Sequence, residues 1–306
     1  MDSSLVAIRW SLYADLGLLF GLLLFALYAL KASERERLLP LRWLTTALAG
    51  LGIVLSGLSF VLAVAAMLGV ALKDVDHASV MMILTETPVG WALLARILAL
   101  TILCAAVLAP WAFRGTGITI LALIAAIPVA SLAWSGHGAA SEGLTGMVHL
   151  AGDILHLLAG SAWIGALAAF ILMLSRRSPI FEQLDTAHRA LAGFATAGTV
   201  IVGLVVVTGI VNSYALIGPQ NISGLFQSAY GQLLFIKLVL FGLMLALAAS
   251  NRFSLTPALA TGIEDGNIEG AVMRLRRSLW LEGGAAVLIL ALVAWLGTLL
   301  PPASAG

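Results

Sequence analysis

Stretches of about 20 apolar residues recur along almost the whole chain, and no other feature constrains the fold as strongly. A helix of about 20 residues crosses a hydrocarbon core of about 30 Å, because each residue adds about 1.5 Å. The stretches show no alternation of polar and apolar residues, which excludes the strands of a membrane barrel. Only 10% of the 306 residues are charged, against about 25% in a soluble domain. The sequence therefore predicts an all-α, polytopic transmembrane bundle.

Clusters of charge and turn residues divide the chain into eight predicted spans, which form a single membrane domain over residues 1–306. The expected spans are approximately 10–30, 43–71, 89–110, 117–136, 147–174, 190–217, 231–250 and 279–300. The longest connection, residues 251–278, is too short for a nucleotide-binding domain, and the sequence has no Walker A motif. The N-terminus lacks a basic n-region, so we expect the first stretch to be a retained helix. The single cysteine, Cys104, excludes an intrachain disulfide and a Cys-x-x-Cys motif.

Basic residues outside the spans gather almost entirely at one face of the predicted bundle. Twelve follow odd-numbered spans: Lys31, Arg35, Arg37, Arg42, Arg114, Arg176, Arg177, Arg189, Arg252, Arg274, Arg276 and Arg277. The opposite face carries only Arg9 and Lys73. Because cytoplasmic loops of membrane proteins carry the excess of Lys and Arg, the twelve-residue face is predicted to be cytoplasmic. Both termini then face the periplasm, and the protein is expected in the inner (plasma) membrane.

Residue types that bind copper are concentrated at the predicted periplasmic face. They are His77, His137, His149, His156, Met81, Met82, Met147, Asp74, Asp76, Asp153, Glu86 and Glu142. Thioether ligands favour Cu(I), and imidazole serves either oxidation state. Met147, His77, Met81, Met82 and Glu142 are candidates for the place where the metal first arrives. Ordinary loop polarity explains His77, Met81 and Met82 equally well.

The fifth span carries the most informative pattern. His149, Asp153, His156 and Trp163 share one helical face, together with Gly160. Ionisable groups inside a span cost at least a few kcal/mol each unless they face the bundle interior or a wet cavity, so they are functional candidates. The alternative is a polar network that only packs this span against its neighbours.

Helix geometry limits how these groups can share a metal ion. His149 and His156 are separated by about 10.5 Å of helix rise, too far to bind one ion without distortion. Two interpretations remain open. Asp153 orients a ligating histidine, or the stripe holds two sites at different depths. In the second case His137, in the segment Trp134-Ser-Gly-His137-Gly, completes the shallower site.

Four further charged residues lie within predicted spans: Asp15, Arg96, Lys237 and Glu282. We expect Asp15 to form a structural ion pair with Arg96 or Lys237, because an unpaired charge inside the membrane is costly. Glu282 is expected to bond Arg252 or Arg277.

Two polar residues flank the connection between the sixth and seventh spans. Asn212 is placed to donate a hydrogen bond to the polar layer, and Tyr214 is typical of an interfacial anchor.

The segment Gly-Asp153-Ile-Leu-His156-Leu-Leu-Ala-Gly-Ser-Ala-Trp163-Ile-Gly resembles the CopD/PcoD family of copper-resistance membrane proteins. Supporting segments are Ser-Gly-His137-Gly, Thr-Gly-Ile-Val-Asn212-Ser-Tyr214, Tyr230-Gly231-Gln-Leu-Leu-Phe-Ile-Lys237, Asn251-Arg252 with Pro257, and Leu-Arg276-Arg277-Ser-Leu-Trp-Leu-Glu282. The resemblance implies an eight-helix inner-membrane protein that handles copper, often encoded beside or fused to the periplasmic copper protein CopC. His137, Asp153, His156 and Trp163 match the family; His149 rests on the helical face alone.

The expected function is copper binding at the periplasmic side followed by import toward the cytoplasm. The resemblance implies a copper ion, as Cu(I) or Cu(II), a CopC-type partner and the lipid bilayer, with no nucleic acid and no catalytic residues, so we do not expect an enzyme. One alternative is a b-type haem protein for electron transfer, with histidines from different spans as haem ligands. The other is a copper-binding scaffold or receptor that transports nothing.

Overall fold

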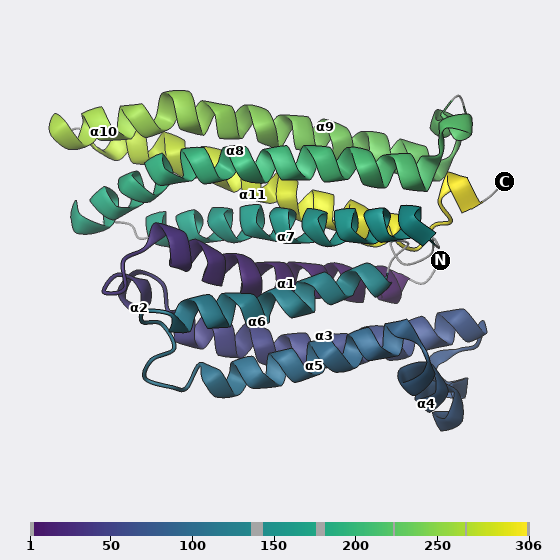
Figure 1. Ribbon diagram of the computed structural model, residues 1–306. Coiled ribbons are helices and arrows are strands. Elements are labelled where there is room, and N and C mark those ends of the chain that lie inside the picture. Colours follow the sequence, from purple (N-terminus) through teal and green to yellow (C-terminus); the bar gives the residue numbers. More distant parts are fainter. Residues whose placement is uncertain (1–2, 136–142, 176–180, 223, 267, 305–306) are drawn as a thin grey trace.

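The computed structural model describes residues 3–135, 143–175, 181–222, 224–266 and 268–304 (Figure 1). Within these residues there are no strands, and eight helices are long and apolar enough to cross a membrane. They are α1 (Ser3–Ala29), α3 (Leu41–Leu68), α5 (Pro88–Ala106), α6 (Gly117–Ser131) continued by a 3₁₀ turn to Ser135, α7 (Gly143–Leu174), α8 (Phe181–Ile217), α9 (Ala229–Ser250) and α11 (Ile268–Leu296). The predicted all-α polytopic fold and its number of spans are confirmed.

The helices differ from the predicted spans mainly at their ends. α1, α8 and α11 begin at Ser3, Phe181 and Ile268, about seven to eleven residues before the spans expected from hydropathy. Polar residues do not end a helix; they only mark where it leaves the hydrocarbon, so these helices continue past the apolar stretch. For the same reason the predicted connection 251–278 is largely helical. A π-helical turn (Asn251–Leu255) and α10 (Thr256–Glu264) carry the chain on from α9.

Local sequence signals set several helix ends. The Thr87 side chain accepts a hydrogen bond from the Gly90 N–H at 3.2 Å, and Pro88 occupies the first turn of α5. Ser228 caps α9 in the same way through the Gly231 N–H at 3.1 Å. These side chains satisfy N–H groups that have no partner inside the helix. α3 ends at Gly69, whose φ of 67° is a left-handed conformation that favours glycine.

α1 and α7 form the centre of the bundle. They pack against each other, with α3, α5 and α6 on one side and α8, α9 and α11 on the other (Figure 1). Gly21 of α1 and Gly165 of α7 meet at their crossing. A Cβ built on Gly165 would lie 2.1 Å from the backbone carbon of Gly21, so the two helices touch backbone to backbone. Small residues allow such close approach between membrane helices.

The two ends of the bundle carry different elements. The described parts of both termini lie at one end, which we call the terminal end, together with the short helix α4 (His77–Glu86) and the 3₁₀ turn η2 (Leu132–Ser135) (Figure 1). The opposite, basic end holds α2 (Arg35–Leu38) and α10. α7 runs from the terminal end to the basic end, so its His149, Asp153 and His156 lie nearer the terminal end than Trp163 does.

Two of the basic residues at the basic end have structural partners that the charge pattern did not reveal. Arg35 is buried and donates to the carbonyls of Ala26 and Phe113, each at 3.0 Å. It thereby satisfies a carbonyl in the last turn of α1, where a helix favours positive charge. Arg189 of α8 donates to the Glu34 carboxylate at 2.6 Å.

The Glu34–Arg189 pair is expected to make stability depend on pH in the acidic range. Burial alone raises the pKa of Glu34, but hydrogen bonds from Arg189 and the Lys31 N–H together bring that pKa below its ordinary value of 4.5. A lowered carboxyl pKa contributes stability above the unfolded pKa and loses it as the pH falls through the folded pKa. Glu34→Gln should therefore destabilise the protein by about 1 kcal/mol at pH 7.

Thermal unfolding of both proteins across pH measures this effect. The difference in Tm should shrink as the pH falls below 4.5, where the wild-type carboxylate becomes protonated. A difference that stayed constant down to strongly acidic pH would mean that the ion pair is not its cause.

Candidate functional site

The polar stripe of α7 faces α8 and α9 in the terminal half of the bundle. The Asp153 carboxylate accepts a hydrogen bond from Asn212 Nδ2 of α8 at 3.1 Å. Lys237 of α9 lies close enough for its charge to act on Asp153. Gly152 leaves room for this contact, because a Cβ there would lie 3.3 Å from Asn212 Oδ1. Three helices thus bring a carboxylate, an amide and an ammonium together inside the bundle.

The hydrogen bonds of His156 determine which of its ring nitrogens can bind a metal. His156 Nδ1 lies 3.0 Å from Thr208 Oγ1 of α8. The Thr208 hydroxyl already donates its only proton to the Leu204 carbonyl, so it can only accept from Nδ1–H. The imidazole is then the tautomer whose Nε2 carries a lone pair, which is the form that ligates a metal ion.

The other predicted ligands are only partly brought to this place. His149 is buried, with 3% of its surface exposed, and lies about one helical turn before Asp153 on the side of the terminal end. His137 and Glu142 lie outside the described residues. Among the residues that the structure describes, no three His, Cys, Asp or Glu side chains gather as a metal site would require. Two possible metal ligands of the stripe, Asp153 and His156, lie about one helical turn apart, and each has a hydrogen-bond partner on α8.

The candidates for first arrival of the metal are dispersed. Met147 is 70% exposed at the start of α7. His77, Met81 and Met82 lie exposed on α4, which packs on α5 and α3 and not on the side of α7 that faces α8 (Figure 1). The structure does not bring α4 to the histidine stripe.

A second polar cluster lies deeper along α7, about 10.5 Å of helix rise beyond His156. The Trp163 indole N–H donates to Glu282 Oε1 at 2.8 Å, and Asn251 Nδ2 donates to Glu282 Oε2 at 2.9 Å. The expected bond from Glu282 to Arg252 or Arg277 is therefore wrong. Indole and amide donors from α7 and the end of α9 face the buried carboxylate, while Arg252 turns outward to Thr199.

A cavity of about 240 Å³ adjoins this second cluster. Trp163, Asn251 and Glu282 line it together with Arg252 and Thr256. Apolar side chains of α7, α8, α9 and α11 form most of the remaining wall. Its lining includes Asn251, Arg252 and Phe253 of the π-helical turn that joins α9 to α10 at the basic end.

The predicted ion pair of Asp15 is also wrong within the described part of the chain. Asp15 is buried, and neither of its carboxylate oxygens accepts a hydrogen bond there. Arg96 instead donates from Nε to the Ser131 hydroxyl at 2.7 Å and from Nη2 to the Ser135 hydroxyl at 3.4 Å, and Lys237 acts on Asp153. Asp15 points at α3, where Gly52 leaves space for its carboxylate. The sequence predicted that these charged residues lie at a similar depth in the membrane. Their side chains nevertheless point toward different neighbours, because each helix has its own rotation about its axis.

Sequence reasoning missed Thr208 and Asn251 as members of the site. Thr208 lies one helical turn before Asn212 on α8, so the two share a face. That spacing was a usable signal, but a threonine in an apolar helix does not stand out by composition. Asn251 stands in the Asn251-Arg252 segment of the family resemblance, but helical spacing gives no sign of its bond to Glu282, which lies 31 residues away. Tyr214, by contrast, is largely exposed, as expected for an interfacial residue.

The fold and the site define a polytopic helical membrane protein that holds a histidine and a carboxylate inside its bundle. The chain belongs to the copper resistance protein D family. Profiles for the copper resistance protein D-like N-terminal domain and for copper resistance protein D match residues 1–147 and 188–296. The family that the sequence resembles is confirmed, and the chain is a copper-handling membrane protein.

Three relatives illustrate the range of the family. Copper resistance protein D of Pseudomonas syringae pv. tomato is 43% identical over 100% of this chain and 99% of its own. Copper transport protein CutJ of Bacillus subtilis is 34% identical over 43% of this chain and 23% of its own. Inner membrane protein YebZ of Escherichia coli is 25% identical over 95% of this chain and 97% of its own. No solved structure matches the chain.

Proposed function

We propose that the chain binds a copper ion at its periplasmic side and imports it toward the cytoplasm. The arrangement of His156 carries this proposal. Its Nε2 lone pair is fixed by the Thr208 hydrogen bond, and Asp153 lies one turn away on the same face. Imidazole binds copper in either oxidation state, whereas a carboxylate suits Cu(II). His149 and His137 are the further donors proposed for the same layer.

The charge pattern supports the proposed orientation. The basic end is cytoplasmic under the positive-inside rule, which places the terminal end and both termini in the periplasm of an inner-membrane protein. A periplasmic copper-binding protein of the CopC type would then deliver the ion at the terminal end. We propose a binding and transport role without a catalysed reaction.

The second cluster supports inward movement of the ion. Glu282 of α11 bonds Trp163 of α7 and so lies deeper than Asp153, and the cavity beside it reaches toward the basic end. An ion released from His156 would meet this carboxylate next.

Metal analysis and transport by the purified protein test the proposal. Wild-type protein should retain copper, and proteoliposomes loaded with a copper-sensitive dye should report copper added outside. Glu282→Gln should keep the bound copper and lose most of the lumenal signal. A protein that binds copper but gives no signal would be a scaffold, and a Soret band in the absorbance spectrum would identify the haem alternative. Absence of bound copper would overturn the proposal.

Removing the Thr208 hydroxyl should weaken copper binding without removing a ligand. Thr208→Val deletes the acceptor that fixes His156 Nδ1–H, so the ring is free to adopt the tautomer that cannot bind through Nε2. The affinity for copper should fall about 10-fold, the lower limit for loss of such a partner. Thr208→Ser retains the hydroxyl and should bind as wild type does. Competition with a chelator of known affinity measures both; equal affinities for valine and serine would contradict the proposed tautomer.

A further inference from the structure

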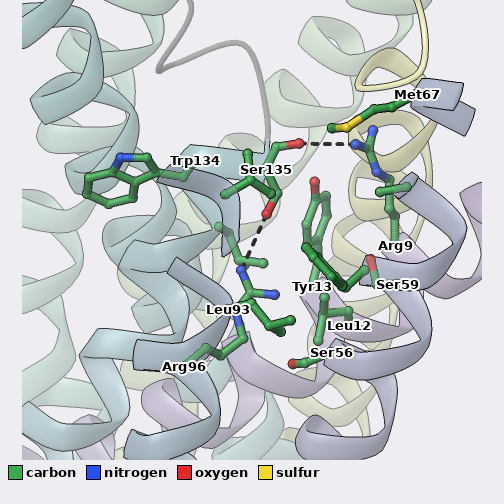
Figure 2. A pocket seen from close by; sticks show the side chains of 14 residues that line it. Arg9, Leu12, Tyr13, Ser56, Ser59, Met67, Leu93, Arg96, Trp134 and Ser135 are labelled. Atoms are coloured by element: carbon green, nitrogen blue, oxygen red, sulfur yellow. Dashed lines mark hydrogen bonds between the residues drawn. The ribbon is translucent and has the colours of Figure 1, made fainter. Parts of the chain in front are cut away.

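A second cavity, of about 170 Å³, opens at the terminal end between α1, α3, α5 and η2. Its polar lining consists of Arg9, Tyr13, Ser56, Ser59, Arg96 and Ser135, and apolar side chains fill the remaining wall. Figure 2 shows the two guanidinium groups on either side of the Tyr13 ring, with Ser56 below them. None of the described residues that line it is a copper ligand proposed above.

The hydrogen bonds of the two arginines are all to neutral groups. Arg96 is only 3% exposed and donates to two serine hydroxyls. Arg9 donates from Nη2 to the Ser135 carbonyl at 3.1 Å (Figure 2). It also donates from Nη1 to the Gly297 carbonyl. These bonds orient the guanidinium groups but leave their two positive charges in place.

Carboxylates that could neutralise this charge lie elsewhere in the described structure. None of the described residues that line the cavity is acidic. Asp15 is on the same helix as Arg9 but faces Gly52, and no salt bridge joins Arg96 to a carboxylate among the described residues. Asp153 acts on the Tyr13 hydroxyl, as both arginines do, but it is engaged with Asn212. A guanidinium buried at membrane depth without a counter-charge is strongly disfavoured.

A further polar group in the wall also lacks a partner. The Ser56 hydroxyl is completely buried and forms no hydrogen bond with any described residue. A serine in an apolar helix normally bonds back to the carbonyl of the preceding turn. The Ser56 hydroxyl and the two guanidinium groups are all hydrogen-bond donors, and an anion with several oxygens would accept hydrogen bonds from all three.

We propose that this cavity binds a small oxyanion, a carboxylate or phosphate group, between Arg9 and Arg96. The planar guanidinium fork matches the oxygen geometry of either group. The hydroxyls of Ser56, Ser59 and Tyr13 donate to its remaining oxygens. A phosphate group could be supplied by a free anion or by a lipid headgroup. Both can reach the cavity, because it opens at the end of the bundle where the spans leave the hydrocarbon.

The test uses the full chain in a neutral detergent at constant ionic strength. Inorganic phosphate, acetate and a short-chain phosphatidylglycerol are each titrated against sodium chloride, with thermal stability and calorimetric affinity as readouts. We expect at least one oxyanion to give a saturable rise in Tm that chloride does not give. Saturation by phosphate or acetate assigns a free anion, and saturation by the lipid alone assigns a headgroup; either supports the site.

Variants locate the binding within the cavity. Arg9→Gln and Arg96→Gln should each weaken the affinity at least 10-fold, and Ser56→Ala, which leaves the charge and the fold unchanged, should weaken it several-fold. Lys73→Gln removes an exposed charge at the same end and should bind as wild type does. The proposal is overturned if no oxyanion saturates the wild-type protein, if chloride acts equally well, or if the arginine and Ser56 variants bind as tightly as wild type.

Discussion

Replacing His156 with alanine is expected to remove tight copper binding by the purified protein while leaving the fold intact. Nε2 of this residue is the donor that the Thr208 hydrogen bond directs away from α8, so its loss removes a ligand. The affinity should fall by more than the roughly 10- to 100-fold that accompanies loss of an outer-shell partner. The measurement is the copper content of the protein after dialysis, with competition against a chelator for the affinity.

Asp153→Ala tests the second donor of the same site. It should also lower the copper content, because the carboxylate either binds the ion or orients the ligating histidine. The variant leaves Lys237 without the opposing charge that acts on it, so its elution profile and Tm must be compared with wild type. His188→Ala removes a histidine near the basic end and serves as the matched control. Unchanged copper content in both the His156 and Asp153 variants would refute a site on α7.

The largest effect on stability is expected from Gly165→Ala at the crossing of α1 and α7. The new Cβ would lie 2.1 Å from the backbone carbon of Gly21. A backbone neighbour cannot rotate away as a side chain can, so the two central helices must separate. Overpacking in a core typically costs about 1–3 kcal/mol, and we expect about 3 kcal/mol or more here. Thermal unfolding in detergent, followed by intrinsic fluorescence, measures the loss.

Gly160→Ala, in the same helix, is the control that separates the effect of alanine on helix propensity from its effect on the α1–α7 contact. A Cβ at this position meets nothing within 4 Å. Alanine favours a helix over glycine by about 1 kcal/mol, so this variant should be as stable as wild type or slightly more stable. Equal losses at positions 160 and 165 would show that close packing of α1 on α7 does not explain the effect.

Much of the candidate site was predictable because it rests on one helix. The positions of Asp153, His156 and Trp163 along α7 follow from helical periodicity alone. Their partners Thr208 and Glu282 come from α8 and α11, and periodicity within a helix says nothing about the rotation of another helix. The expected hydrogen bond from Asn212 to the polar layer is present. The bond from Trp163 to Glu282, which forms a separate cluster, was not predicted, because it depends on the rotation of α11.

The sequence by itself determined that the chain is a helical membrane bundle with eight spans. In the absence of water the backbone must bond itself, so the length and hydropathy of each apolar stretch are enough to identify a spanning helix. It also determined which residues of α7 share the polar stripe. Only the tertiary structure decided how the embedded charges are partnered. Asp15 faces Gly52, Arg96 bonds two serines, and Glu282 bonds Trp163 and Asn251. Depth in the membrane is a one-dimensional property of the sequence, whereas facing depends on the rotation and packing of every neighbouring helix.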